Sequence, residues 1–190
     1  MQEFTVIAIT PPLFFKGESE IINRILSQNE AQFVHIRKPG SSISDMEKLI
    51  CEVDSRFYIK LKIHDHFDLA AQFGLGGVHL NSRYSVPPKN SLSTSKSLHS
   101  IEELEDAANF DYCFLSPIFD SISKQGYKAK FNLKELTPLI RDKNIIALGG
   151  VTPLKFSFLK ELGFKGGALL SHFFPFSLTS VPHLMDLNHP

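Results

Sequence analysis

The sequence predicts an α/β protein that folds as one small (β/α)8 or TIM barrel over residues 1–190. Two observations support this class. Short apolar runs rich in β-branched and aromatic residues alternate with longer segments of helical period. Eight such runs in a single domain favour a closed ring over an open flavodoxin-like sheet, because the weak fifth strand can be sheltered in a ring.

The eight apolar runs give the expected strands in chain order. They are Phe4–Thr10, Phe33–Arg37, Tyr58–His64, Gly77–Leu80, Leu92–Ser95, Tyr112–Ser116, Ile145–Leu148 and Gly167–Leu170. One pattern occurs twice in the sequence: a helix end, a glycine turn and a strand follow one another in FGLGGVHL and again in LGFKGGALL. Repetition of one βα unit is the simplest account of this repeated pattern.

The segments between the strands give the expected helices, some of them short or irregular because the chain is small for this fold. They are Glu18–Gln28, Ser44–Ser55, Phe67–Phe73, Ile101–Ala108, Leu133–Arg141 and Leu154–Leu162, with a weaker one near Ser180–Leu187. Asp65 and Ser100 are expected to cap helix starts, and Gly74 and Gly163 to follow helix ends. Residues 84–91 are typical of a loop.

Composition excludes several classes of function. Lys plus Arg equals Asp plus Glu at 20 each, so no basic field favours nucleic acid or an anionic membrane. No apolar run approaches the ~20 residues that a membrane helix needs. Cys51 and Cys113 are the only cysteines, and the strand-like start MQEFTVIAIT has no leader pattern, which predicts a reducing cytoplasm. A homo-oligomer is left open.

The stretch HIRKPG places polar residues at the end of an apolar strand. Period two puts His35 and Arg37 on one face of that strand, opposite Val34 and Ile36. His35 and Arg37 would then point into the barrel at its carboxyl end, where this fold carries its active sites. A buried arginine needs an anion, so the strand predicts either an anionic ligand or an internal pair with an acid such as Asp65.

Polar and glycine residues follow the other expected strands at the same end of the barrel. They are His64, Asp65 and His66 after the third strand, Ser121, Ser123 and Lys124 after the sixth, Gly149 and Gly150 after the seventh, and Ser171 and His172 after the eighth. Gly149-Gly150 suits close approach of an anion to backbone N–H groups, and a helix beginning near Pro153 would add its positive end. The pattern predicts a phosphate site.

Five stretches, IHDHFDLAAQFGLGGVHL, SLHSIEEL, DYCFLSPIFDSISK, IIALGGV and GGALLS, occur in the order found in one family. Together they resemble the thiamine phosphate synthases and the related thiazole tautomerases. The resemblance implies a (β/α)8 barrel and a transferase that couples hydroxymethylpyrimidine diphosphate to thiazole phosphate with loss of pyrophosphate. It implies small phosphorylated pyrimidine and thiazole substrates and a Mg²⁺ ion.

The resemblance also implies roles for individual residues. Arg37, Lys124 and Ser97 would be catalytic, Asp65 would bind the metal, and the substrate-binding residues would be His35, Lys38, His64, Ser121, Ser123, Gly149, Gly150 and Ser171. The chain departs from the family pattern at several places, one of them His64, which stands where the pattern has an Asn. His35 replaces a Gln, Pro39 replaces a Lys, and Tyr84 stands where an acid completes the metal site, so the Mg²⁺ site is expected to be weakened.

Two alternatives stay open. A relative that keeps the barrel and the thiazole phosphate site could isomerise or merely bind its ligand, although Pro117 stands where the tautomerases carry a His. A metal-dependent hydrolase would instead be built on His64, Asp65 and His66. Lys62 shares a predicted strand face with His64 and could replace the missing lysine. His79 is expected to serve packing.

Overall fold

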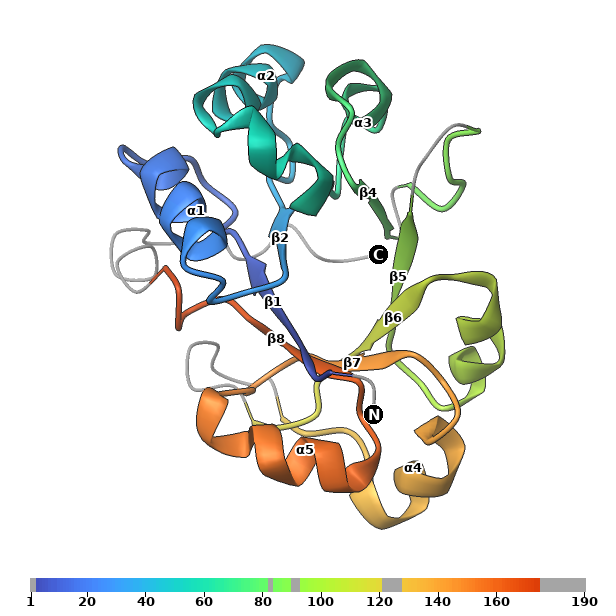
Figure 1. The fold of residues 1–190 in the computed structure, drawn as a ribbon. Helices are drawn as coiled ribbons and strands as arrows, with labels where there is room; N and C mark the ends of the chain where they lie inside the picture. Colours follow the sequence, from blue (N-terminus) through green and yellow to red (C-terminus); the bar gives the residue numbers. More distant parts are fainter. Residues whose placement is uncertain (1–2, 82–83, 90–92, 121–127, 175–190) are drawn as a thin grey trace.

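A computed structural model describes residues 3–81, 84–89, 93–120 and 128–174. Eight parallel strands form a closed barrel in the order β1-β2-β3-β4-β5-β6-β7-β8, and β8 pairs with β1 to close it. Figure 1 shows these strands at the centre with the helices arranged around them. The predicted fold class is confirmed.

The strands are short and each pairs in parallel with the next along the chain. Their bounds are β1 Thr5–Ile9, β2 Phe33–Ile36, β3 Leu61–Ile63, β4 Gly77–Leu80, β5 Thr94–Leu98, β6 Tyr112–Leu115, β7 Ile145–Ala147 and β8 Gly166–Leu169. The α-helices are α1 Glu18–Ser27, α2 Ile43–Glu52, α3 Asp68–Phe73, α4 Leu133–Ile140 and α5 Phe156–Leu162. Three 3-10 helices complete the set: η1 Ser55–Lys60, η2 Glu102–Asn109 and η3 Pro153–Lys155.

Three expected elements differ from the structure. The third strand does not begin at Tyr58, because Ser55–Lys60 forms η1, which the Asp54 side chain caps by accepting from the Arg56 N–H. The fifth strand starts later and runs to Leu98. Its inward side chains are serines, so apolar content was a poor guide to its extent. The helix expected over Ile101–Ala108 is a 3-10 helix, and the one near Ser180–Leu187 lies outside the described residues.

The expected helix ends are mostly correct. Gly74 and Gly163 adopt left-handed conformations after α3 and α5, and a strand follows each, as the repeated pattern predicted. Ser100 accepts a hydrogen bond from the Glu103 N–H at 3.4 Å near the start of η2. Asp65 was wrongly expected to cap α3, which starts after Phe67 with no side-chain cap.

Alternation along the strands separates the barrel interior from the layer beneath the helices. Val34 and Ile36 belong to an outer apolar cluster with Ile25 of α1 and Met46 of α2. The alternate residue His35 is fully buried, with its ring centroid 4.9 Å from that of Phe114 inside the barrel. The interior cluster contains Ile7, Ile9, Tyr112, Phe114, Ile146 and Ala168. The side of the interior formed by β2 to β5 is therefore polar, and the opposite side is apolar.

A second outer cluster joins β5, β6 and β7 to η2, α4 and α5. Together the outer clusters bury the apolar faces of the helices and hold the strand ends in place. Within the part of the chain that the structure describes, no helix is long and apolar enough to span a membrane.

Candidate active site

The floor of the candidate site is a chain of hydrogen bonds inside the barrel. His35 on β2 and His64, which directly follows β3, approach with Nδ1 and Nε2 2.9 Å apart. The other nitrogen of His35, Nε2, lies 2.6 Å from the Tyr112 hydroxyl on β6. Burial, followed by the nearby charges of His79 and Lys62, lowers the pKa of His35 well below 6.5. His35 is therefore a neutral, hydrogen-bonded side chain at pH 7.

His79 on β4 connects this chain to β5. Its Nδ1 is 2.9 Å from the Ser95 hydroxyl, and its Nε2 is 2.9 Å from the Ser97 hydroxyl. Its ring stacks on that of His64 with centroids 4.2 Å apart. Burial, then the positive charges of Lys62 and Arg37, lowers the pKa of His79 to about 3. The neutral imidazole thus orients Ser97, one of the residues predicted to act in the site.

Arg37 follows β2 and is half-buried, with its backbone N–H donating to the Thr10 hydroxyl at 3.0 Å. Because Val34 and Ile36 pack under the helices, alternation turns Arg37 to the barrel side. Its effect on the pKa of His79 agrees with that placement. The arginine therefore brings a positive charge to the carboxyl end of the barrel.

Lys62 lies deeper in the barrel than Arg37, on β3. Its ammonium donates to the Ser93 hydroxyl and lies over two rings, 5.4 Å from the centroid of Phe33 and 5.1 Å from that of Tyr112. Burial lowers the pKa of Lys62 to about 8, against the opposing charge of Asp111. These partners belong to the amino-terminal half of the strands, so the structure places Lys62 below the histidines.

Asp65 follows His64 and is only 3% exposed. Mg²⁺ is commonly held by one or two carboxylates together with substrate phosphates, and a buried carboxylate at a strand end fits that requirement. The second position of the family's metal site is occupied by Tyr84, whose side chain is 39% exposed and contacts the Phe67 ring. Asp65 would therefore be the one protein carboxylate available to the ion among these positions.

His66 is turned away from the other histidines. It adopts a positive φ of 55°, and its Nε2 lies 2.7 Å from the Ser41 carbonyl oxygen. This contact ties the loop after β3 to the loop after β2. A metal centre on His64, Asp65 and His66 therefore has no geometric support, and the hydrolase alternative is not retained.

Lys38 is buried in a different environment from the one expected. Its ammonium donates to both carboxylate oxygens of Glu18, at 2.6 and 2.8 Å, and to the carbonyl oxygens of Pro11 and Leu13 at 2.8 and 2.9 Å. These contacts join the loop after β1 to the end of β2. They engage the donors that substrate binding would need, so the structure gives Lys38 a structural position.

The glycine pair after β7 makes a close contact with the loop after β6. Gly149 and Gly150 have positive φ values of 91° and 60°. A Cβ on Gly150 would lie 2.3 Å from the Asp120 carbonyl oxygen, and one on Gly149 would lie 2.8 Å from Pro117. Glycine is therefore required at both positions. Ser171 is exposed in the turn that follows β8.

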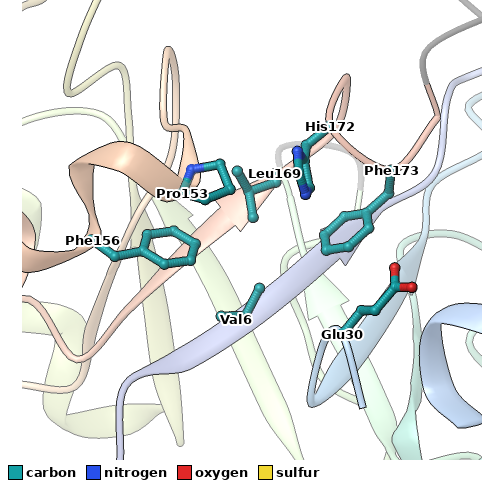
Figure 2. Close-up of a pocket in the computed structure, with 7 residues that line it drawn as sticks. All are labelled: Val6, Glu30, Pro153, Phe156, Leu169, His172 and Phe173. Atoms are coloured by element: carbon teal, nitrogen blue, oxygen red, sulfur yellow. The ribbon is translucent and has the colours of Figure 1, made fainter. Parts of the chain in front are cut away.

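A cavity of about 300 Å³ lies outside the barrel, where β1 and β8 face α5. Figure 2 shows its lining, which is mostly apolar. The lining residues are Val6, Glu30, Pro153, Phe156, Leu169, His172 and Phe173. Of the polar residues expected at the strand ends only His172 lines it, and none of the residues given a catalytic, substrate-binding or metal-binding role does.

Comparison with known proteins agrees with this arrangement of strands. A family model described as thiamine monophosphate synthase matches residues 6–173. The chain belongs to the thiamine monophosphate synthase family. A curated thiamine-phosphate synthase from Prochlorococcus marinus (strain AS9601) is 24% identical over 169 residues, which cover 80% of this chain. The match spans 46% of that relative, so this chain corresponds to less than half of its length.

Solved structures give the same fold. A thiamine phosphate pyrophosphorylase from Bacteroides thetaiotaomicron superposes with a TM-score of 0.77 at 28% identity, covering 97% of this chain and 90% of that one. A thiamine phosphate pyrophosphorylase from Pyrococcus furiosus has a TM-score of 0.70 at 20% identity, covering 90% and 87%. At that identity the second likeness supports the fold alone.

The structure brings four of the residues predicted from the synthase family into one connected group. His35 contacts His64, Ser97 joins them through His79, and Arg37 acts electrostatically on His79. Lys38 is not part of this group. Ser121, Ser123 and Lys124 lie outside the described residues.

Two members of the group, His79 and Tyr112, were not predicted as site residues from the sequence. His79 was assigned to packing, and Tyr112 was not considered. Both lie at inward positions of neighbouring or facing strands. Pairing the eight strands in register before assigning roles would have placed His35, His64 and His79 on one wall.

Proposed function

We propose that this chain acts as a thiamine phosphate synthase, a transferase that joins hydroxymethylpyrimidine diphosphate to thiazole phosphate and releases pyrophosphate. The observation that carries the proposal is the group of Arg37, Ser97 and the neutral histidines at the carboxyl end of a barrel of this family. This end is where the fold carries its active sites.

The reaction forms one bond and breaks another. The thiazole nitrogen donates an electron pair to the methylene carbon of the pyrimidine, and the bond from that carbon to the diphosphate oxygen breaks with its electron pair leaving on pyrophosphate. Negative charge therefore grows on the leaving group. Catalysis requires fixed positive charge and hydrogen-bond donors near that group, and it requires no protein nucleophile.

Arg37 supplies the fixed positive charge in this proposal, and its bidentate donors suit a phosphate. The Ser97 hydroxyl, held by His79 Nε2, donates to the same anion. Lys124 is proposed as a second cation on the basis of the family pattern. His64, at the end of β3, would contact the pyrimidine ring, and neutral His35, whose two ring nitrogens contact His64 and Tyr112, would hold His64 in position.

Mg²⁺ would neutralise diphosphate charge and would be held by Asp65. Gly149, Gly150 and Ser171 are proposed, on the family pattern, to bind the thiazole phosphate through backbone N–H groups of the turns after β7 and β8. Holding both substrates in line would lower the barrier further. The free cysteines Cys51 and Cys113 agree with a reducing, cytoplasmic location.

The proposal is tested by incubating purified protein with both substrates and Mg²⁺ and measuring thiamine phosphate and pyrophosphate together. We expect equal amounts of the two products. Arg37→Ala should lower kcat by about 100-fold or more, the loss typical of removing one charge-stabilising donor. Asp65→Ala should raise the Mg²⁺ concentration needed for half-maximal rate.

The control replaces His66, which points at Ser41, by Asn and should retain the rate. Binding of thiazole phosphate with no product at saturating Mg²⁺ would replace the synthase by a non-synthase relative of the same fold. Tyr84 stands where the family pattern has the second metal-binding acid, and this replacement is the feature that favours the second candidate.

A further inference from the structure

Three imidazoles meet inside the barrel more closely than the hydrogen-bonding roles proposed for the synthase reaction demand. One ring nitrogen from each of His35, His64 and His79 lies within 4.8 Å of the nitrogens of the other two, and all three residues are buried. Across the described residues, this is the one group of three or more His, Cys, Asp or Glu side chains that could hold a metal ion.

We propose that His35, His64 and His79 bind a divalent transition-metal ion of the zinc type inside the barrel. Imidazole nitrogen is a good ligand for Zn²⁺, Co²⁺, Ni²⁺ and Cu²⁺ and a poor one for Mg²⁺, which prefers oxygen. The site is therefore chemically distinct from the Mg²⁺ position proposed at Asp65. Because metal binding is measured without substrates, its outcome can be told apart from the presence or absence of synthase activity.

The separations are close to those of a bound site. Zn–N bonds of about 2.0–2.1 Å in a tetrahedral site place ligand nitrogens about 3.3 Å apart. His35 Nδ1 and His64 Nε2 already lie 2.9 Å apart. The widest separation in the group has to close by about 1.5 Å at most, which rotation of one ring about its side-chain bonds achieves.

The surroundings of the rings supply the outer hydrogen bonds that metal-bound histidines usually make. Because His35 Nδ1 faces His64, its Nε2–H is free to donate to the Tyr112 hydroxyl at 2.6 Å. His79 has a serine hydroxyl at each nitrogen, so one nitrogen can bind the ion while the other keeps its serine. Such contacts fix the tautomer and orientation of a ligand.

The charged groups around the three histidines act on a bound cation in both directions. Burial keeps His35 and His79 neutral at pH 7, which is the form that binds a metal without releasing a proton. The charges of Lys62 and Arg37 oppose a cation here, and the carboxylate of Asp65 next to His64 favours it. His64 is 5% exposed at the strand end, so an ion would enter from the carboxyl end of the barrel.

The experiment uses the untagged full-length chain, treated with a chelator and then titrated with Co²⁺ or Zn²⁺ in the absence of substrates. Co²⁺ bound by three imidazoles in a tetrahedral site gives visible absorption bands. We expect one equivalent to bind, Zn²⁺ to displace it, and excess Mg²⁺ to leave it in place.

His35→Gln and His64→Asn keep polar side chains of similar size and should each weaken Co²⁺ binding by at least about tenfold. The matched control is His66→Asn, which removes a neighbouring histidine outside the group and should leave binding unchanged. Circular dichroism of each metal-free variant shows whether it has folded. In folded variants, Zn²⁺ should raise the Tm of the parent and the His66 variant but not that of the His35 variant.

Three results would overturn the proposal. The first is a parent protein that shows no visible Co²⁺ bands at any ratio. The second is equal binding by the parent and by folded His35→Gln. The third is binding that is lost with His66→Asn, which would assign the ion to the surface. Each of them would leave the three histidines as a hydrogen-bonded wall of the barrel.

Discussion

The buried ion pair between Lys38 and Glu18 should dominate the stability of the loop between β1 and α1. The two side chains are 0% and 1% exposed. The ammonium lies within hydrogen-bonding distance of four oxygens, two of them backbone carbonyl oxygens, and 4.8 Å from the centroid of the Phe14 ring. Burial raises the pKa of Glu18 and lowers that of Lys38, in each case against the attraction of the partner.

The cost of breaking the pair follows from its burial. Removing one member leaves the other charge buried without compensation, which costs about 3–5 kcal/mol. For a domain of this size, 1 kcal/mol lowers Tm by about 2–4 °C, so Glu18→Leu should lower Tm by about 6–20 °C. Replacing both residues, Glu18→Leu with Lys38→Met, removes both charges and should recover part of that loss, because the carbonyl oxygens of Pro11 and Leu13 still lose their donor.

The assay is thermal and denaturant unfolding of the parent, the two single variants and the double variant. Asp106→Asn is the control, because its pair with Lys96 is partly exposed on both sides and should be worth less than about 1 kcal/mol. If Glu18→Leu cost no more than the Asp106 control, Lys38 would not be locked in a buried pair. If the double variant were no more stable than the single variants, the cost would come from packing and not from charge.

Three further predictions concern the barrel itself. Gly150→Ala should destabilise the fold by more than Gly74→Ala, measured by chemical unfolding, since both have positive φ but only Gly150 would place its Cβ against backbone; equal losses would contradict this. Lys62 has a pKa of about 8 in the folded chain and an ordinary value of 10.5, so the unfolded chain binds more protons between these two pH values. As the pH is raised from about 8 to about 10.5, the free energy of unfolding should therefore rise by up to about 3 kcal/mol. Lys62→Met should abolish this rise. Because His79 has a pKa of about 3, the free energy of unfolding should fall by up to about 1.4 kcal/mol for each pH unit below pH 6.5. A free energy of unfolding that stays constant from pH 6.5 to pH 4 would show that His79 is not buried as a neutral group.

The sequence was sufficient to predict the barrel because the fold depends on repeated local patterns. Val34 and Ile36 alternate with His35 and Arg37, and this alternation sets which face meets the helices. Gly74 and Gly163 end their helices for a conformational reason that is visible in one residue. Such signals need no knowledge of distant contacts.

The contacts of individual polar residues could not be predicted in the same way. The family resemblance implied that Lys38 binds substrate, yet its partner Glu18 is 20 residues away and lies on another element. The residues just before β3 were expected to extend that strand because Tyr58 and Ile59 are apolar, but they belong to the capped 3-10 helix η1. The contact between His35 and His64 depends on the register of neighbouring strands, which no single stretch of sequence contains.

The proposed synthase activity is tested most directly by measuring thiamine phosphate and pyrophosphate together, for the parent and for Arg37→Ala. Each protein is given the two phosphorylated substrates and Mg²⁺. We expect stoichiometric products from the parent and a loss of about 100-fold or more in kcat for the variant, with the fold unchanged by circular dichroism. Equal rates for the parent and folded Arg37→Ala, or pyrophosphate released without thiamine phosphate, would contradict it.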